Sequence, residues 1–140
     1  MSNQPQVGYL LKQAQSLLRL RMEEALKPLD LTVSQYSCLH SLRRDPGISA
    51  AALARSVFMT RQSMSAMLQQ LIDRGLVTRP QQPTSGRALP TALTPTGNDA
   101  LDAAQQLVTE VEQRMLGALS ADERAALAHG LAACVEGLSA

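Results

Sequence analysis

Apolar residues recur at intervals of three and four along most of this 140-residue chain, the spacing of helices that bury one face. Residues that cap or break helices separate the periodic segments. We therefore expect six helices joined by short connections. In chain order they are residues 4–27, a segment from Thr32 or Ser34 to about Arg44, residues 49–57, residues 60–75, a segment from Thr94 through Met115, and a segment from Ser120 to Leu138.

Local chemistry marks the ends of these segments. Pro28 ends the first helix, and Gly75 stands where a C-terminal glycine would stop the fourth. Most of the starts carry a hydroxyl side chain that can accept a hydrogen bond from first-turn backbone N–H groups. The expected caps are Thr32 or Ser34, Ser49, Thr60, Thr94 (followed by Pro95) and Ser120 (with Glu123 completing a capping box).

One stretch departs from the helical period. Residues 76–80 (LVTRP) and 88–94 (ALPTALT) are extended in character, and residues 81–87 (QQPTSGR) between them are rich in turn formers. This stretch predicts a β-hairpin, with Pro90 confining the second strand to an edge. The expected fold class is therefore mainly α with a small β-hairpin.

Charge is unevenly distributed, although the net charge of the chain is only +1. Between Arg43 and Arg87 there are seven arginines and two aspartates, whereas from Gly97 onward there are two arginines and seven acids. A region of one sign attracts partners of the opposite sign over a Debye length of about 10 Å. The basic middle of the chain favours a polyanionic partner; the alternative is an accidental cluster of solvated charges.

The predicted helix at residues 60–75 shows no acid before Asp73. Its polar face is small, neutral or cationic, which suits the DNA major groove, about 12 Å wide and lined with donors and acceptors. A short helix, a tight turn and this capped helix make a helix-turn-helix, to which the hairpin adds a wing. Arg87 at the wing tip is placed to enter the adjacent minor groove or to contact the backbone.

The flanking helices carry more apolar surface than the small middle region can cover. Their seams have the spacing of paired helices. They consist of Leu101, Ala104, Val108, Val111 and Met115, and then of Leu127, Leu131, Cys134 and Leu138. We expect a dimer, the alternative being that these stripes close the core of one chain. Within a single integrated domain, residues 1–30 and 95–140 would form the N- and C-terminal dimerisation helices, and residues 31–94 the winged helix-turn-helix.

Three segments resemble the MarR family of winged helix-turn-helix regulators: LTVSQYSCLHSL (residues 31–42), ALARSVFMTRQSMSAMLQQLIDRGLVTR (52–79) and GRALPTALTPTG (86–97). The resemblance implies a homodimeric repressor that binds a pseudo-palindromic double-stranded DNA operator and is released by a small ligand or, as the weaker alternative, by an oxidant. The DNA-binding residues it implies are Ser49, Thr60, Arg61, Gln62, Ser63, Ser65, Arg74, Arg79 and Arg87. Of these, Arg74 and Arg79 would brace the fold or contact the DNA backbone. Two positions depart from the family's frequent residues: Ser85 replaces an acid, and Ala66 replaces a basic residue.

The resemblance also implies an effector crevice between the dimerisation helices and the winged unit, suited to a small aromatic or phenolic molecule. Its candidate lining residues are Gln13, Arg21, Tyr36, His40 and Met59. Ordinary packing or solvent exposure is the alternative for each of them. Both cysteines, Cys38 and Cys134, fall in apolar stripes, so we expect them to fill cores rather than to act as redox switches.

Other classes of function find little support. The sequence has only two cysteines and two histidines, too few for a typical metal site, and it has no glycine-rich phosphate loop. We therefore expect no catalytic residue, metal site or cofactor. No apolar run approaches the roughly 20 residues of a membrane helix, and the N-terminus lacks signal-peptide features, so we expect a cytoplasmic protein. The remaining rival is a winged-helix adaptor that binds a protein instead of DNA, and the acid-free helix face argues against it.

Overall fold

The computed structural model describes residues 6–79 and 91–139, and its elements follow the predicted order. They are α1 (Val7–Leu26), the 3₁₀ turn η1 (Lys27–Leu29), α2 (Val33–Arg44), α3 (Ala50–Ser56), α4 (Arg61–Asp73), β1 (Val77–Thr78), β2 (Ala92–Leu93), α5 (Pro95–Leu116) and α6 (Ala121–Leu138). The expected wing tip with Ser85 and Arg87, and Pro90 of the expected second strand, lie outside the described residues.

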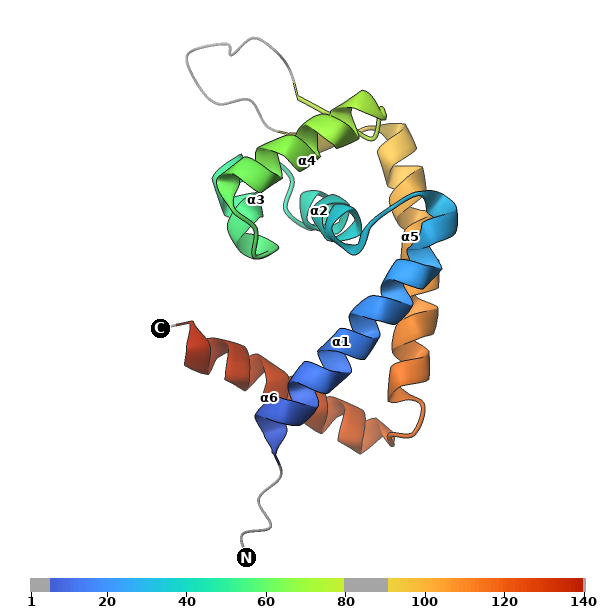
Figure 1. Cartoon of the computed structure of the whole chain (residues 1–140), viewed down its shortest axis with the longest axis vertical. Coiled ribbons are helices and arrows are strands. Elements are labelled where there is room, and N and C mark those ends of the chain that lie inside the picture. The colour runs from blue at the N-terminus through green and yellow to red at the C-terminus, as the bar shows by residue number, and fades with distance from the viewer. Residues whose placement is uncertain (1–5, 80–90, 140) are drawn as a thin grey trace, which may run out of the picture.

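The helices form two regions of different character (Figure 1). α2, α3, α4 and the base of the hairpin gather at one end, while α1 and α5 run side by side away from it. α6 turns back from the far end of α5. This arrangement leaves α4 on the outside of the compact end.

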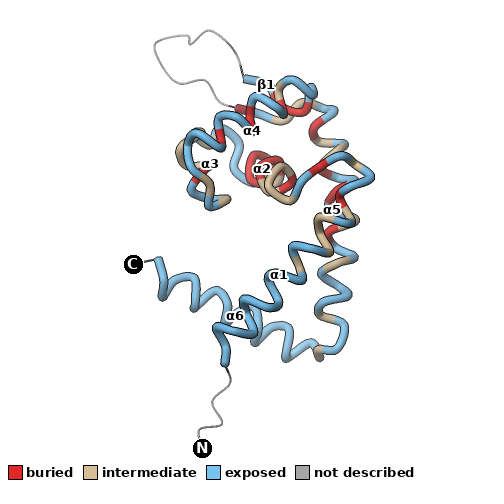
Figure 2. Tube along the Cα trace, in the orientation of Figure 1, coloured by how far each residue is buried: buried red, intermediate tan, exposed pale blue. Residues whose placement is uncertain are grey.

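The hydrophobic core lies in the compact end and at its junction with α1 and α5. Leu39 of α2, Met64 and Leu68 of α4, and Leu101 of α5 are fully buried together with Leu26 at the end of α1. Burying a side chain of this size stabilises a fold by about 1.5–3 kcal/mol. Figure 2 shows that burial is concentrated here and that α6 is exposed along its length.

The predicted caps are confirmed. Thr32, rather than Ser34, caps α2, because its side chain accepts from Gln35 N while the Gln35 side chain accepts from Thr32 N. The hydroxyls of Ser49, Thr60, Thr94 and Ser120 accept from backbone N–H groups in the same way. Gly75 has φ +74°, the left-handed conformation expected of a glycine that follows a helix.

The base of the hairpin is joined directly to the start of α5. The two strands are antiparallel, with Val77 opposite Leu93 and Thr78 opposite Ala92. Thr94 N donates to Leu76 O (3.1 Å), and Thr94 Oγ1 donates to Gly75 O (2.6 Å). Gly97 packs so closely that a side chain there would overlap the Leu76 carbonyl. The orientation of the wing base is therefore tied to α5.

Two expectations about the flanking helices need correction for the single chain. Cys134 was expected to pack in a hydrophobic core. In the single chain it is exposed, as are the other described residues of α6, none of which is buried. The α5 seam is split, since Leu101, Ala104 and Val108 are buried whereas Met115 is exposed. Among the residues that the structure describes, no helix combines the length and the hydropathy required to cross a membrane.

Candidate nucleic-acid interface

α4 presents one polar face to solvent because its apolar face is locked into the core. Met64, Leu68 and Leu71 are fully buried. The residues that remain exposed are Arg61, Gln62, Ser63, Ser65, Ala66, Gln69, Gln70 and Asp73. A rigid helix with a small and largely uncharged outer face can approach a double helix closely.

The start of α4 adds polarity of its own. Thr60 Oγ1 accepts from Ser63 N at 3.0 Å. The remaining first-turn N–H groups have no partner within the helix and carry the positive end of its dipole. Arg61 is exposed in this first turn. The N-terminal end of α4 is thus suited to a phosphate or to another acceptor.

One ridge of the exposed face of α4 includes two residues outside the expected DNA-binding set, Gln69 and Asp73. Gln62, Ala66, Gln69 and Asp73 follow one another at three- or four-residue spacing, so they share one side of the helix. Gln69 Nε2 donates to Asp73 Oδ1 at 2.9 Å, which fixes the orientation of the amide. The i,i+4 spacing of these two residues was the available signal.

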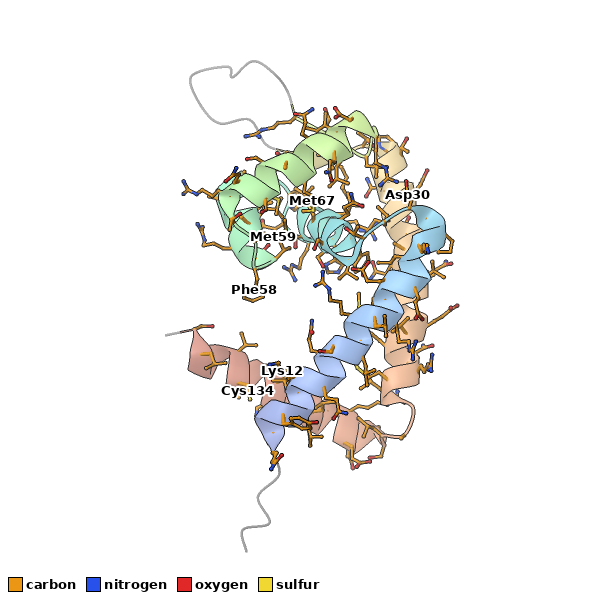
Figure 3. All side chains as sticks on the ribbon, in the orientation of Figure 1. Lys12, Asp30, Phe58, Met59, Met67 and Cys134 are labelled. Atoms are coloured by element: carbon orange, nitrogen blue, oxygen red, sulfur yellow. The ribbon has the colours of Figure 1, made fainter. Side chains whose placement is uncertain are left out.

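The arginines of the basic region divide into engaged and exposed groups. Arg74 Nη1 donates to the backbone oxygen of Asp30 at 2.7 Å, so Arg74 braces the end of α4 against the α1–α2 connection. Asp30 is labelled on that connection in Figure 3. Arg43 bonds Asp102 at 2.6 Å and Gln105 at 3.2 Å, linking α2 to α5. Arg55, Arg61 and Arg79 are exposed.

Ser49 and Thr60, two other expected DNA-binding residues, both use their hydroxyls as helix caps. Each is exposed at the start of its helix, Ser49 at α3 and Thr60 at α4. A capping hydroxyl oxygen that accepts a backbone N–H still has its own O–H to donate. Capping and phosphate contact are therefore compatible.

A pocket lies where α1, α2, the end of α3 and α5 meet. Its volume is about 390 Å³, and it brings together two of the five expected effector residues, Tyr36 and His40. Their ring centroids are 6.0 Å apart. The other lining residues are Met22, Ser37, Ser41, Arg44, Ser56, Val57, Phe58, Val108 and Glu112. Burial, with a smaller contribution from the Glu112 carboxylate, raises the pKa of Tyr36, so its hydroxyl stays protonated at neutral pH.

The other three expected effector residues lie elsewhere. Gln13 lines a shallow groove along α1 with Tyr9 and Lys12. Arg21, on α1, lines a separate hollow between α1 and α5 and bonds Glu24 at 3.0 Å. Met59 is half-buried in the connection between α3 and α4, where it packs against the core. Sequence reasoning missed Phe58, Arg44 and Glu112, because nothing in their spacing places them around Tyr36.

A wider surface hollow, about 760 Å³, lies between α1 and the end of α4. Four carboxylates line it, from Glu23, Glu24, Asp30 and Asp73, against two cations, Lys27 and Arg74. The Arg74 guanidinium is already bonded to Asp30. The charge of this hollow does not suit an anionic ligand, in spite of its size.

Cys38 is fully buried in α2, as expected of a core residue. Burial raises the pKa of its thiol to about 12. Since the thiolate is the reactive form, Cys38 has the properties of a packing residue rather than of an oxidant sensor.

The comparisons with known proteins agree with this geometry. The sequence model of the MarR family matches residues 29–88. The HTH-type transcriptional repressor Rv2887 of Mycobacterium tuberculosis is 39% identical over 118 residues, which cover 84% of this chain and 85% of the relative. The crystal structure of Rv2887 in complex with salicylic acid superposes with a TM-score of 0.77 at 35% identity, covering 96% of this chain and 99% of the other.

A second solved structure is the transcriptional repressor CouR bound to a 23-mer DNA duplex. It matches with a TM-score of 0.82 at 34% identity and covers 91% of each chain. The similarity therefore extends over the long flanking helices as well as over the compact end.

Proposed function

The chain belongs to the MarR family of winged helix-turn-helix regulators, and from this premise we propose that it is a homodimeric transcriptional repressor. It binds a pseudo-palindromic site in double-stranded DNA and is released by a small aromatic effector. The observation that carries the proposal is the outer face of α4, which is capped at Thr60, anchored by Met64 and Leu68, and free of acids until Asp73.

The DNA-facing residues divide by chemistry. Three exposed residues of α4 carry uncharged polar side chains, namely Gln62, Ser63 and Ser65. These side chains are placed to contact base edges in the major groove. Arg61 and Arg79, together with the caps Ser49 and Thr60, are suited to phosphates. Arg74 acts by positioning α4, because its guanidinium is bonded to Asp30. Arg87 would extend the interface into the adjacent groove, as the family resemblance implies.

The homodimer follows from the exposed apolar side chains of the flanking helices. They include Leu10 and Leu11 of α1, Met115 of α5, and Leu127 and Leu131 of α6. An apolar surface of this extent is unusual on a monomer and typical of an interface. A two-fold dimer presents two copies of α4 to two half-sites, which is the reason for a pseudo-palindromic operator.

The effector site is the pocket around Tyr36 and His40. An aromatic ring suits its apolar side chains Met22 and Val108, and a carboxylate suits the guanidinium of Arg44. The relative Rv2887 has been crystallised with salicylic acid, an aromatic carboxylic acid of this kind. Effector binding beside the α3–α4 connection would change the position of α4 and so lower the affinity for DNA.

We assign no catalytic role to the chain. The adjacent acids Asp122 and Glu123 lie in the first turn of α6, where Glu123 completes a capping box with Ser120. A hydrogen bond from the Ser120 backbone N–H lowers the pKa of the Glu123 carboxyl, which is the opposite of what a general acid requires. A repressor that binds chromosomal DNA would act in the cytoplasm, the location that the sequence predicts.

The proposal is tested by selecting bound sequences from a random duplex pool and then titrating salt with the selected duplex. Arg61→Ala should flatten the slope of log K against log salt by about 1, the effect of one lost phosphate contact. Arg19→Ala, on α1 and outside the expected DNA-binding set, is the matched control and should leave the slope unchanged. An unchanged slope for Arg61→Ala removes this residue from the interface. If the wild-type protein does not bind duplex DNA even in dilute salt, the result supports the alternative function, a winged-helix adaptor that binds a protein instead of DNA.

A further inference from the structure

The end of α3 has the backbone of a glycine-terminated helix but carries a phenylalanine. Met59 N donates to Ala54 O (2.8 Å) and Phe58 N donates to Arg55 O (3.3 Å), the paired hydrogen bonds of a Schellman motif. Phe58 occupies the left-handed position of that motif, with φ +58°. Glycine dominates this position because a β-carbon is disfavoured there. The backbone of Phe58 is therefore strained.

The ring of Phe58 gains nothing within the chain to offset this strain. It is 93% exposed, the largest exposed fraction among the large apolar side chains that the structure describes. Figure 3 shows the ring projecting away from the α2–α4 core into the space between the compact end and α6. Strain together with an exposed aromatic ring is more typical of a functional residue than of a packing residue.

Phe58 also links two parts of the proposed mechanism. It lines the pocket that contains Tyr36 and His40. It precedes Thr60, the cap of α4, by only two residues, and Met59 between them packs against the core. A ligand that contacts the Phe58 ring is thus coupled through a very short segment to the start of the recognition helix.

We propose that Phe58 is the residue that senses the effector. Its ring closes over an aromatic carboxylate held in the pocket by Arg44, and this contact shifts the start of α4. The ring supplies an aromatic face to the ligand. Leaving the left-handed conformation would relieve the strain at Phe58 in exchange for the two hydrogen bonds of the Schellman motif. This inference rests on the proposed function and assigns the coupling between effector and DNA to a single side chain.

The decisive variant is Phe58→Gly, because glycine suits the left-handed backbone while removing the ring. The melting temperature should stay equal or rise, since no buried contact is lost and strain is relieved. The probe is salicylate. Its dissociation constant for the DNA-free protein, measured by calorimetry, should rise at least 10-fold in Phe58→Gly. The concentration of salicylate that halves DNA binding, normalised to each variant's own DNA affinity, should rise by a similar factor.

Phe58→Tyr is the matched control and should keep the response to salicylate, since it retains an aromatic ring. A wild-type protein that fails to bind any duplex contradicts the proposed function as a whole. A wild-type protein that binds DNA and salicylate, with the same response in Phe58→Gly, contradicts the role of Phe58 alone. Absence of salicylate binding to the wild type overturns the aromatic-carboxylate assignment.

Two further outcomes also overturn the proposal. A lower melting temperature for Phe58→Gly would show that the ring has a structural role. Weaker self-association in sedimentation experiments would show that it contacts the second copy of the chain. Both are measured on the same purified proteins as the salicylate titration.

Discussion

Gln69 and Asp73 lie one turn apart on α4. The hydrogen bond between them limits which donor and acceptor groups the Gln69 amide could offer to a DNA base. With one N–H donated to Asp73, the amide still offers its oxygen and its second N–H. A glutamine with both groups available matches the N6 and N7 edge of adenine. The sequence placed these residues one turn apart, but the orientation of the amide comes only from the structure.

Cys38 is the second case in which environment determines the chemistry of a residue. Burial raises the pKa of its thiol from the ordinary 9.0 to about 12. The thiol therefore binds its proton more tightly in the folded state than in the unfolded state. Its contribution to the free energy of unfolding is complete below pH 9 and is lost as the pH rises from about 9 to 12.

We expect Cys38 in the single-cysteine variant Cys134→Ser to resist a disulfide-exchange reagent at pH 8 and to react fully once guanidinium unfolds the protein. The rate of reaction, followed by released thiolate absorbance, tests this. Adding Cys38→Ala to the Cys134→Ser variant removes both thiols, so this protein measures the absorbance change of the reagent alone. Rapid labelling of the native protein, or loss of DNA binding in peroxide that Cys38→Ser prevents, would show that the thiol is a sensor after all.

At the scale of the elements, helix boundaries were predictable from the sequence because they depend on local chemistry. Thr60 and Ser120 cap their helices through hydrogen bonds to residues three positions away, so the signal lies within one turn. The choice between Thr32 and Ser34 needed the structure. The left-handed end of α3 was not predictable, because the residue there is Phe58 and not glycine.

The candidate site was less predictable than the elements. The face of α4 follows from its period, so the exposure of Arg61 and Gln62 was readable from the sequence. The proposed effector pocket joins four separate helices, and only Tyr36 and His40 of the five expected residues line it. Arg74 was expected to brace α4 or to contact the DNA backbone, and its bond to Asp30 favours the brace.

Gly97 tests the junction between the wing and α5. Gly97→Ala should lower the free energy of unfolding by about 1–3 kcal/mol, because the added methyl group would overlap the backbone oxygen of Leu76. Urea unfolding followed by circular dichroism measures the change. Gly8→Ala in α1, where an added β-carbon meets nothing within 4 Å, is the matched control and should not destabilise. Equal stability of the two variants would mean that the junction relaxes freely.

At the scale of the whole molecule, the compact end and the flanking helices are coupled by contacts that cross the boundary between them. Arg43 of α2 bonds Asp102 and Gln105 of α5. Thr94, at the start of α5, bonds Gly75 and Leu76 at the base of the hairpin. In the proposed dimer, two copies of α4 held this way would keep a separation set by the dimer interface, so an altered dimer geometry would be transmitted to α4.

The dimer itself is tested on α6, where Leu131 is exposed in the single chain and lies in the apolar seam with Leu127. Leu131→Glu places a charge in that seam, and we expect a monomer in sedimentation experiments. Affinity for a two-half-site operator should fall at least 100-fold, because each recognition helix then binds without the effective concentration that its partner provides. His129→Glu adds the same charge on the opposite side of α6 and should leave the dimer intact. A dimeric Leu131→Glu protein with unchanged affinity would exclude this face of α6 from the interface.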